Sequence, residues 1–283
     1  MKDDDALSEI LQAPLLMFAQ LLYEKPPEVS VDEIRERLAA AMPQARLVAN
    51  DEKKAALLVV HENHLIELQD GKKLPAQTAI VTSSSIDPEV LSTAVAQTWG
   101  WEGAKGAVER ARHQIVVTEL MALGLEPQVR VALFFEVLKI VSQCLPPVAV
   151  HCHHAERIVD PATLSEASPD EDADAFLAVV LNVRLFRIEK AESEETLMDT
   201  RGLATLGLPD LQIHFRDLEP GHLYGMAVYI YTRGDCIEDG QTVQGLTADQ
   251  AWKCQHEQSL AGPTRLVIDI DPGDPFAAGA RRR

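Results

Sequence analysis

Four consecutive residues, His151-Cys152-His153-His154, carry the strongest chemical signal in the sequence. Successive side chains of a β-strand point to opposite faces, so His151 and His153 would share one face, and Cys152 and His154 the other. Two imidazoles on one face could bind zinc or copper, with a third ligand from a distant loop. The alternative is a strand end that holds no metal. Because no second ligand pair follows at zinc spacing, we predict no cofactor and keep zinc as the weaker alternative.

A second polar group lies in the segment from Asp199 to Phe215. His214 alternates with Ile213 and so lies on the polar face of a strand, where it could act as a general base beside Asp210 or Asp217. The structural alternatives are a surface histidine, an Asp199 that caps a short helix and an Asp210 that hydrogen-bonds its own turn. His214, Asp210 and Asp199 are therefore a candidate polar site, and no catalytic residue is assigned.

The sequence lacks the familiar catalytic motifs. It has no phosphate-binding loop of the Walker type and no Gly-x-Gly-x-x-Gly. It also has no Gly-x-Ser-x-Gly elbow and no His-Glu-x-x-His pair. The common nucleotide, hydrolase and metalloprotease chemistries thus lose support, although an unfamiliar enzyme is still compatible with the sequence.

The formal net charge of -18, from 44 acidic and 26 basic residues, bears on partners. Such a surface repels phosphate backbones, so we expect no nucleic-acid partner. The same charge would attract a basic protein or a cation. The alternative is a solvated acidic surface with no specific partner.

Three features indicate a cytoplasmic protein. No stretch approaches the roughly 18 consecutive apolar residues of a membrane span, so no membrane association is expected. The acidic start, residues 1–5, is opposite in charge to a signal peptide. The four cysteines show no paired spacing, which suits a reducing compartment. The final residues, 280–283, are interpreted as a loose basic tail.

Hydrophobic periodicity predicts the elements of the first half. Ser30 is expected to cap a helix that ends at Pro43, and Pro127 to open a strongly apolar helix. The dipeptide Glu62-Asn63 predicts a hairpin turn, across which His61 and His64 could face each other. The expected strands are residues 15–23, 46–49, 55–61, 64–68, 77–82, 113–119 and 148–152, and the expected helices are residues 31–42, two within 87–112, and 127–143.

The second half is predicted to begin with a long strand at residues 176–188. A short helix at residues 198–206 would end at Gly207 in the left-handed conformation. An Asp239-Gly240 turn is expected to join two short strands. The remaining predictions are strands at residues 211–215, 252–258 and 264–270 and a helix at residues 220–232.

This order predicts an α+β fold with mixed, largely antiparallel sheets and helices packed on one face, arranged as one sheet system or as two similar-sized α/β layers. The acidic, proline-containing stretch at residues 160–174 is the candidate connection. The expected domains are an N-terminal α/β domain, residues 1–160, and a C-terminal α+β domain, residues 175–283. One continuous domain is the alternative.

The runs DTRGLATLGLPDLQIHF and YGMAVYIYTRGDCIEDGQTVQG resemble the bacterial family called domain of unknown function 4261. Shared features are a Gly-Leu-Pro-Asp corner that leads into a strand, a helix, an Asp-Gly hairpin that ends in Thr-x-x-Gly, and the start of the last strand, Gly262-Pro263-Thr264-Arg265. The similarity covers residues 199–271. The N-terminal half is similar only in plan, through Arg110, His113, Val116 and a strand near His151. The resemblance implies a fold arrangement and a bacterial setting, and it brings no catalytic residues.

We therefore expect a non-catalytic intracellular protein-binding protein of bacteria. By analogy with other small acidic bacterial proteins, it would serve as an immunity or accessory protein for a secreted toxin. The alternative is a metal-binding protein or hydrolase-like enzyme that uses the cluster at residues 151–154. A structural subunit of a homo-oligomer is the third hypothesis.

Overall fold

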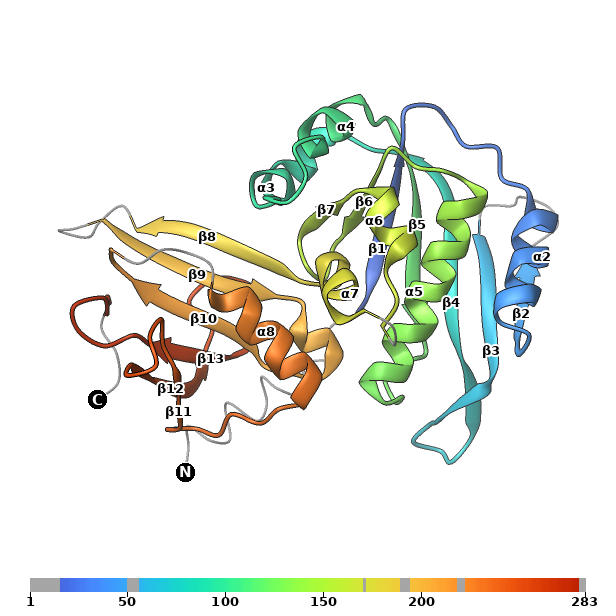
Figure 1. The fold of residues 1–283 in the computed structure, drawn as a ribbon. Helices are drawn as coiled ribbons and strands as arrows, with labels where there is room; N and C mark the ends of the chain where they lie inside the picture. The colour runs from blue at the N-terminus through green and yellow to red at the C-terminus, as the bar shows by residue number, and fades with distance from the viewer. Residues whose placement is uncertain (1–15, 50–55, 170–171, 189–193, 218–221, 280–283) are drawn as a thin grey trace. The chain divides into compact units, whose positions relative to one another are not determined.

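The computed structural model describes residues 16–49, 56–169, 172–188, 194–217 and 222–279. The expected acidic start and basic tail lie outside these ranges. The described chain divides into two compact units, residues 16–180 and residues 181–279 (Figure 1). The chain passes from the first unit to the second between Val180 and Leu181.

The N-terminal unit is built on a seven-stranded sheet in which all neighbouring strands are antiparallel. In spatial order the strands are β2 (Ala45–Ala49), β3 (Ala56–Glu67), β4 (Lys73–Ser85), β5 (His113–Leu120), β1 (Phe18–Tyr23), β6 (Ala149–Cys152) and β7 (Arg157–Val159). The predicted opening strand is confirmed as β1.

The helical elements of this unit are α2 (Val31–Ala41), η1 (Pro88–Leu91), α3 (Ser92–Ala96), α4 (Ala104–Arg110), α5 (Pro127–Cys144), α6 (Pro161–Glu166) and α7 (Ala173–Val180). Helix α2 begins as predicted, because the backbone N–H of Glu33 donates to Oγ of Ser30 over 3.3 Å. Pro127 opens α5, whose apolar side chains are buried over most of its length. Figure 1 shows α5 lying along one face of the sheet.

Tyr23 shows which face of β1 helix α5 covers, because its hydroxyl donates to the carbonyl oxygen of Leu145 at the end of α5, over 2.9 Å. The neighbouring residue, Leu22, therefore points to the opposite face. There it packs with Ala149 and with Leu91 and Val108 of the η1–α3–α4 group. The sheet is thus covered by helices on both faces at its β1–β6–β7 end.

A buried ion pair fixes α5 on the sheet. Nε of Arg130, in the first turn of α5, donates to Oε2 of Glu119 on β5 over 2.6 Å. The same carboxylate accepts the backbone N–H of Met17 over 2.7 Å. The two side chains are 9% and 2% exposed. Contacts to an ionised carboxylate at this burial are among the strongest hydrogen bonds in a protein.

The predicted hairpin at Glu62-Asn63 is wrong, because β3 is one continuous strand through these residues. The register with β4 shifts there: His61 lies opposite Ala76, and Leu65 lies opposite Pro75. The polar dipeptide therefore forms a β-bulge, in which extra residues of one strand oppose fewer residues of its partner.

The predicted long strand at residues 176–188 is also only partly right. Its first residues belong to helix α7, and the strand begins at Asn182 as β8 (Asn182–Ile188). A short apolar run such as Phe176–Val180 fits a buried helix as well as a buried strand, so periodicity alone does not separate the two.

The C-terminal unit is built on a six-stranded sheet. Strands β10 and β13 are parallel, and the other pairs are antiparallel. Helix α8 (His222–Arg233) contacts β9 and β10. In spatial order the strands are β11 (Thr242–Gln244), β12 (Ala251–Gln258), β13 (Leu266–Asp271), β10 (Asp210–Phe215), β9 (Glu195–Arg201) and β8.

Two local predictions in this unit need correction. The first residues of the expected short helix belong to the end of β9, and only Leu203–Leu206 are helical, as the 3-10 helix η2; Gly207 takes the left-handed conformation as predicted, with φ 74°. The Asp239-Gly240 turn does not join two strands. Instead β11 pairs with β12, so the hairpin loop comes after Gln244.

The predicted α+β class is confirmed: the described residues form helices and two largely antiparallel sheets. Within those residues, no helix combines the length and the apolar character required to cross a bilayer.

Candidate functional site

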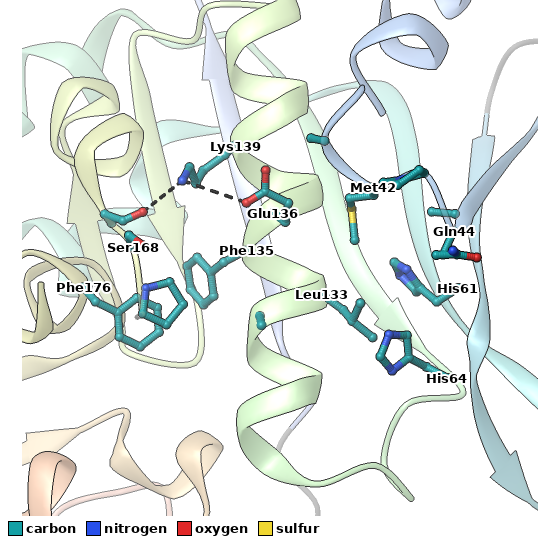
Figure 2. A pocket seen from close by; sticks show the side chains of 16 residues that line it. Met42, Gln44, His61, His64, Leu133, Phe135, Glu136, Lys139, Ser168 and Phe176 are labelled. Carbon is teal, nitrogen blue, oxygen red and sulfur yellow. Dashed lines mark hydrogen bonds and ion pairs between the residues drawn. The ribbon is translucent and has the colours of Figure 1, made fainter. Parts of the chain in front are cut away.

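A pocket of about 370 Å³ opens inside the N-terminal unit. Its walls come from α5, from β3, from the connection between α2 and β2 and from the connection between α6 and α7 (Figure 2). Its polar lining residues are Gln44, His61, His64, Glu136, Lys139 and Ser168. Most of the other lining residues are apolar, among them Met42, Leu133, Phe135 and Phe176.

His61 is the most buried polar side chain of the pocket, at 2% exposure. Its Nε2 lies 2.9 Å from Oγ1 of Thr78 on β4. Its Nδ1 is buried and has no hydrogen-bond partner among the described residues. The residues opposite His61 on the two neighbouring strands are Ala45 and Ala76. These small side chains leave room beside the imidazole.

The β-bulge explains why two histidines three residues apart line one pocket. In a regular strand, residues i and i+3 point to opposite faces. The extra residues between His61 and Leu65 break this alternation, and His64 also lines the pocket. In Figure 2 both imidazoles project toward Leu133 of α5. The sequence prediction paired the two histidines correctly but placed them on a hairpin.

Burial keeps His61 uncharged at neutral pH. Loss of solvation, with a smaller contribution from the nearby His64, lowers the pKa of His61 from 6.5 to about 4. The imidazole therefore offers a neutral hydrogen-bonding nitrogen to the pocket.

The other end of the pocket carries an ion pair. Nζ of Lys139 donates to the carbonyl oxygen of Ala167 over 3.0 Å and lies 3.9 Å from Oε2 of Glu136. Figure 2 shows the ammonium of Lys139 between Glu136 and the segment that carries Ser168. The ammonium is thus held by two oxygens, and the formal charges of Lys139 and Glu136 cancel.

Aromatic rings close the pocket between α5 and α7. The rings of Phe135 and Phe176 pack edge to face, with centroids 5.6 Å apart and planes at 80°. Both residues are almost fully buried. This geometry is favourable for two aromatic rings and gives the pocket a rigid apolar wall.

The cluster at residues 151–154 divides between the two faces of the sheet. His151 lies opposite Gln20, and its Nδ1 is 2.5 Å from Oε1 of that residue. His153 stacks on Phe18, with ring centroids 4.0 Å apart. The rings of His151 and His153 lie 5.8 Å apart, so these two histidines are neighbours.

Cys152 and His154 lie on the α5 side. Cys152 is fully buried opposite Ala19, and burial raises the pKa of its thiol to about 12. The His154 ring packs edge-on against Phe134 and Phe135. Across the described ranges, no three histidine, cysteine, aspartate or glutamate side chains are grouped so that they could hold a metal ion.

The second predicted group, His214, Asp210 and Asp199, is only partly brought together. Asp199 and Asp210 share one partner, Arg265, whose Nη2 and Nε donate to them over 2.6 and 2.9 Å. His214 instead lies 3.1 Å from Oε2 of Glu195. The histidine is therefore paired at the far end of β10 and does not join the two aspartates.

The two aspartates belong to a buried ionic network. Arg184 on β8 forms a bidentate contact with Asp199, over 2.9 and 2.6 Å. Asp210 also accepts the hydroxyl of Thr200 and the backbone N–H of Leu203, over 3.1 and 3.0 Å. Both carboxylates are fully buried. Burial raises the pKa of Asp210, and the guanidinium of Arg265 acts in the opposite direction.

A family model described as "Domain of unknown function (DUF4261)" matches residues 199–271. The matched segment contains Asp199, Asp210 and Arg265, and the pocket lies outside it. No curated protein and no solved structure matches the chain.

Most of the pocket could not be predicted from the sequence. Glu136 and Lys139 are two charged residues, one turn apart, on an otherwise strongly apolar helix. Residues at i and i+3 share a helix face, so this pair was the available signal. Ser168 and Phe176 were hidden because the connection and helix α7 around them were assigned differently.

Acid should destabilise the N-terminal unit through His61. The unfolded chain takes up this proton near pH 6.5 and the folded chain only near pH 4, so the stability present above pH 6.5 falls between these values. We expect this residue to account for about 2 kcal/mol of the loss in unfolding free energy between pH 7 and pH 5. His61→Gln should remove that contribution, and His113→Gln, outside the pocket, should retain it.

Urea unfolding in a Trp252→Phe background measures this effect. The remaining tryptophans, Trp99 and Trp101, both lie in the N-terminal unit and report on it alone. If His61→Gln lost as much stability on acidification as the unaltered background, His61 would not be the responsible group.

The network of the C-terminal unit should depend on Arg265. Arg265→Met leaves Asp199 and Asp210 buried with one fewer cation, and we expect it to lower the unfolding free energy of this unit by about 3–5 kcal/mol. Arg233→Met, at an exposed arginine of α8, should change it by less than about 0.5 kcal/mol. Hydrogen exchange of the β10 and β13 amides measures both values, and equal effects of the two variants would contradict the role given to Arg265.

Proposed function

We propose that this protein functions by binding rather than by catalysis, and that its N-terminal unit takes a small molecule into the pocket. The observation that carries the proposal is the buried Nδ1 of His61, which has no partner among the described residues and belongs to a side chain that lines a pocket of about 370 Å³. Pockets of this size, mainly apolar with a few polar groups, are typical of small-molecule sites. A ligand that hydrogen-bonds Nδ1 would offset the cost of burying that nitrogen unpaired.

The chemistry of the lining supports binding over catalysis. A general base works best when its pKa is close to the operating pH, and the pKa of His61 lies well below 7. Among the described lining residues, no hydrogen bond joins Ser168 to His61 or His64, so the pair needed to activate a serine nucleophile is not formed. Lys139 and Glu136 are already engaged with each other and with Ala167.

Ala132 offers a direct test, because it lines the pocket from an exposed position on α5. The uncharged fluorescent probe N-phenylnaphthylamine should bind the unaltered chain saturably. Ala132→Trp should obstruct the pocket and raise the Kd of the probe at least about tenfold, or about 1.4 kcal/mol. Gln143→Trp places the same side chain at an exposed position of α5 outside the pocket, and it should leave the Kd unchanged.

Fluorescence titration of the unaltered protein and of the two tryptophan variants with the probe tests whether the probe binds in this pocket. Equal affinity in all three would mean that the probe binds elsewhere and would remove the support for a ligand in this pocket.

A second candidate is binding to a basic protein, which the net charge of -18 supports. Charge of one sign steers a partner of opposite sign and weakens its association as salt rises. A secreted toxin, with this chain as its immunity or accessory protein, is the partner we propose within this class.

This candidate makes its own prediction. The tagged chain, incubated with extract of its native cell at low salt, should retain one dominant basic protein at near-equal amount. High salt should release it, because exposed charges interact over only about 10 Å at 0.1 M ionic strength. Mass spectrometry of the retained material identifies it. A retained protein that is not basic, or one that high salt does not release, would count against the electrostatic part of the proposal.

A further inference from the structure

The charges and polar atoms of the pocket indicate what kind of molecule it would take. Lys139 and Glu136 are its two charged side chains of opposite sign, and their Nζ and Oε2 atoms lie 3.9 Å apart. The ammonium also donates to the carbonyl oxygen of Ala167. A charged ligand would have to compete with this pairing, and an anion would also meet the repulsion of a chain that carries a net charge of -18.

At the opposite end of the pocket lies the neutral imidazole of His61, whose single N–H proton can be on Nδ1 or on Nε2. The hydroxyl of Thr78 can donate to Nε2 of His61 or accept from it. In the first case Nδ1 carries the proton and donates; in the second case Nδ1 accepts. A ligand amide or hydroxyl offers both a donor and an acceptor, so it can satisfy Nδ1 in either tautomer.

We propose that the pocket binds an uncharged molecule with an apolar body, held by Phe135, Phe176 and Leu133, and with an amide or hydroxyl group that hydrogen-bonds Nδ1 of His61. This inference rests on the function proposed above and adds the chemical class of the ligand. The pocket volume equals that of roughly a dozen water molecules, which limits the ligand to about two or three small rings or a short chain.

Three probes of nearly equal size separate the chemical classes. Benzamide is uncharged and carries an amide, benzoate is an anion, and benzylamine is a cation. Titration of the full chain with each probe, followed by the amide and imidazole resonances of the protein, gives three Kd values at the same site. We expect benzamide to bind with a Kd at least about tenfold lower than those of the two charged probes.

Two variants locate the contact. His61→Leu removes the hydrogen bond to the amide and should raise the Kd of benzamide roughly fivefold to tenfold. His113→Leu makes the same change at a histidine outside the pocket and should leave that Kd within about twofold. The preference among the probes is measured on the unaltered chain, so it decides the inference even if His61→Leu does not fold.

The outcomes separate the inference from the proposal on which it rests. Absence of benzamide binding overturns the inference. So does tighter binding of benzoate that Lys139→Met abolishes, or tighter binding of benzylamine that Glu136→Gln abolishes, because the ligand class would then be charged. The proposed function itself fails only if N-phenylnaphthylamine also shows no binding that Ala132→Trp weakens.

Discussion

The ion pair between Glu119 and Arg130 is the contact on which the N-terminal unit depends. A carboxylate removed from water is costly unless it is paired and its oxygens are hydrogen-bonded, and Glu119 meets both conditions through Arg130 and the backbone of Met17. The pair sets where helix α5 crosses the sheet. Because α5 supplies Leu133, Phe135, Glu136 and Lys139, this contact helps to position one wall of the pocket.

In the C-terminal unit, two buried aspartates are likewise paired with arginines, here Arg184 and Arg265. Arg265 comes from the start of β13, Asp199 from β9 and Asp210 from β10, so one guanidinium joins three strands of the sheet. Both carboxylates accept several donors, which is the condition under which buried charge is tolerated. The network lies in the segment that the family model matches. Its burial and its saturated hydrogen bonds favour a role in holding the sheet together.

Local pattern was enough for elements whose signals are local. Ser30 capped its helix, Pro127 opened the apolar helix, and the alternation of Leu211 to Phe215 correctly indicated a strand, although the strand is buried on both faces and not on one. Local pattern was not enough where contacts with residues distant in the sequence determine the structure. Asp199 was expected at a helix end because charged residues are usually exposed, and its pairing with Arg265, 66 residues away, leaves no trace in local periodicity. The pocket was missed for the same reason, since its walls come from four separate parts of the chain.

The β-bulge shows how one such long-range decision creates a site. Glu62 and Asn63 between two apolar runs have the composition of a turn, but strand β4 continues alongside both runs and keeps β3 extended. The extra residues are then absorbed as a bulge, and His64 joins His61 at the pocket instead of pointing to the opposite face. Ala45 and Ala76 lie opposite His61 on the two neighbouring strands, and burial without a partner for Nδ1 carries a cost in stability. A bulge that changes the direction of a side chain and a polar atom buried without a partner on a pocket-lining residue are features that packing alone does not favour. The proposed ligand site rests on these two features.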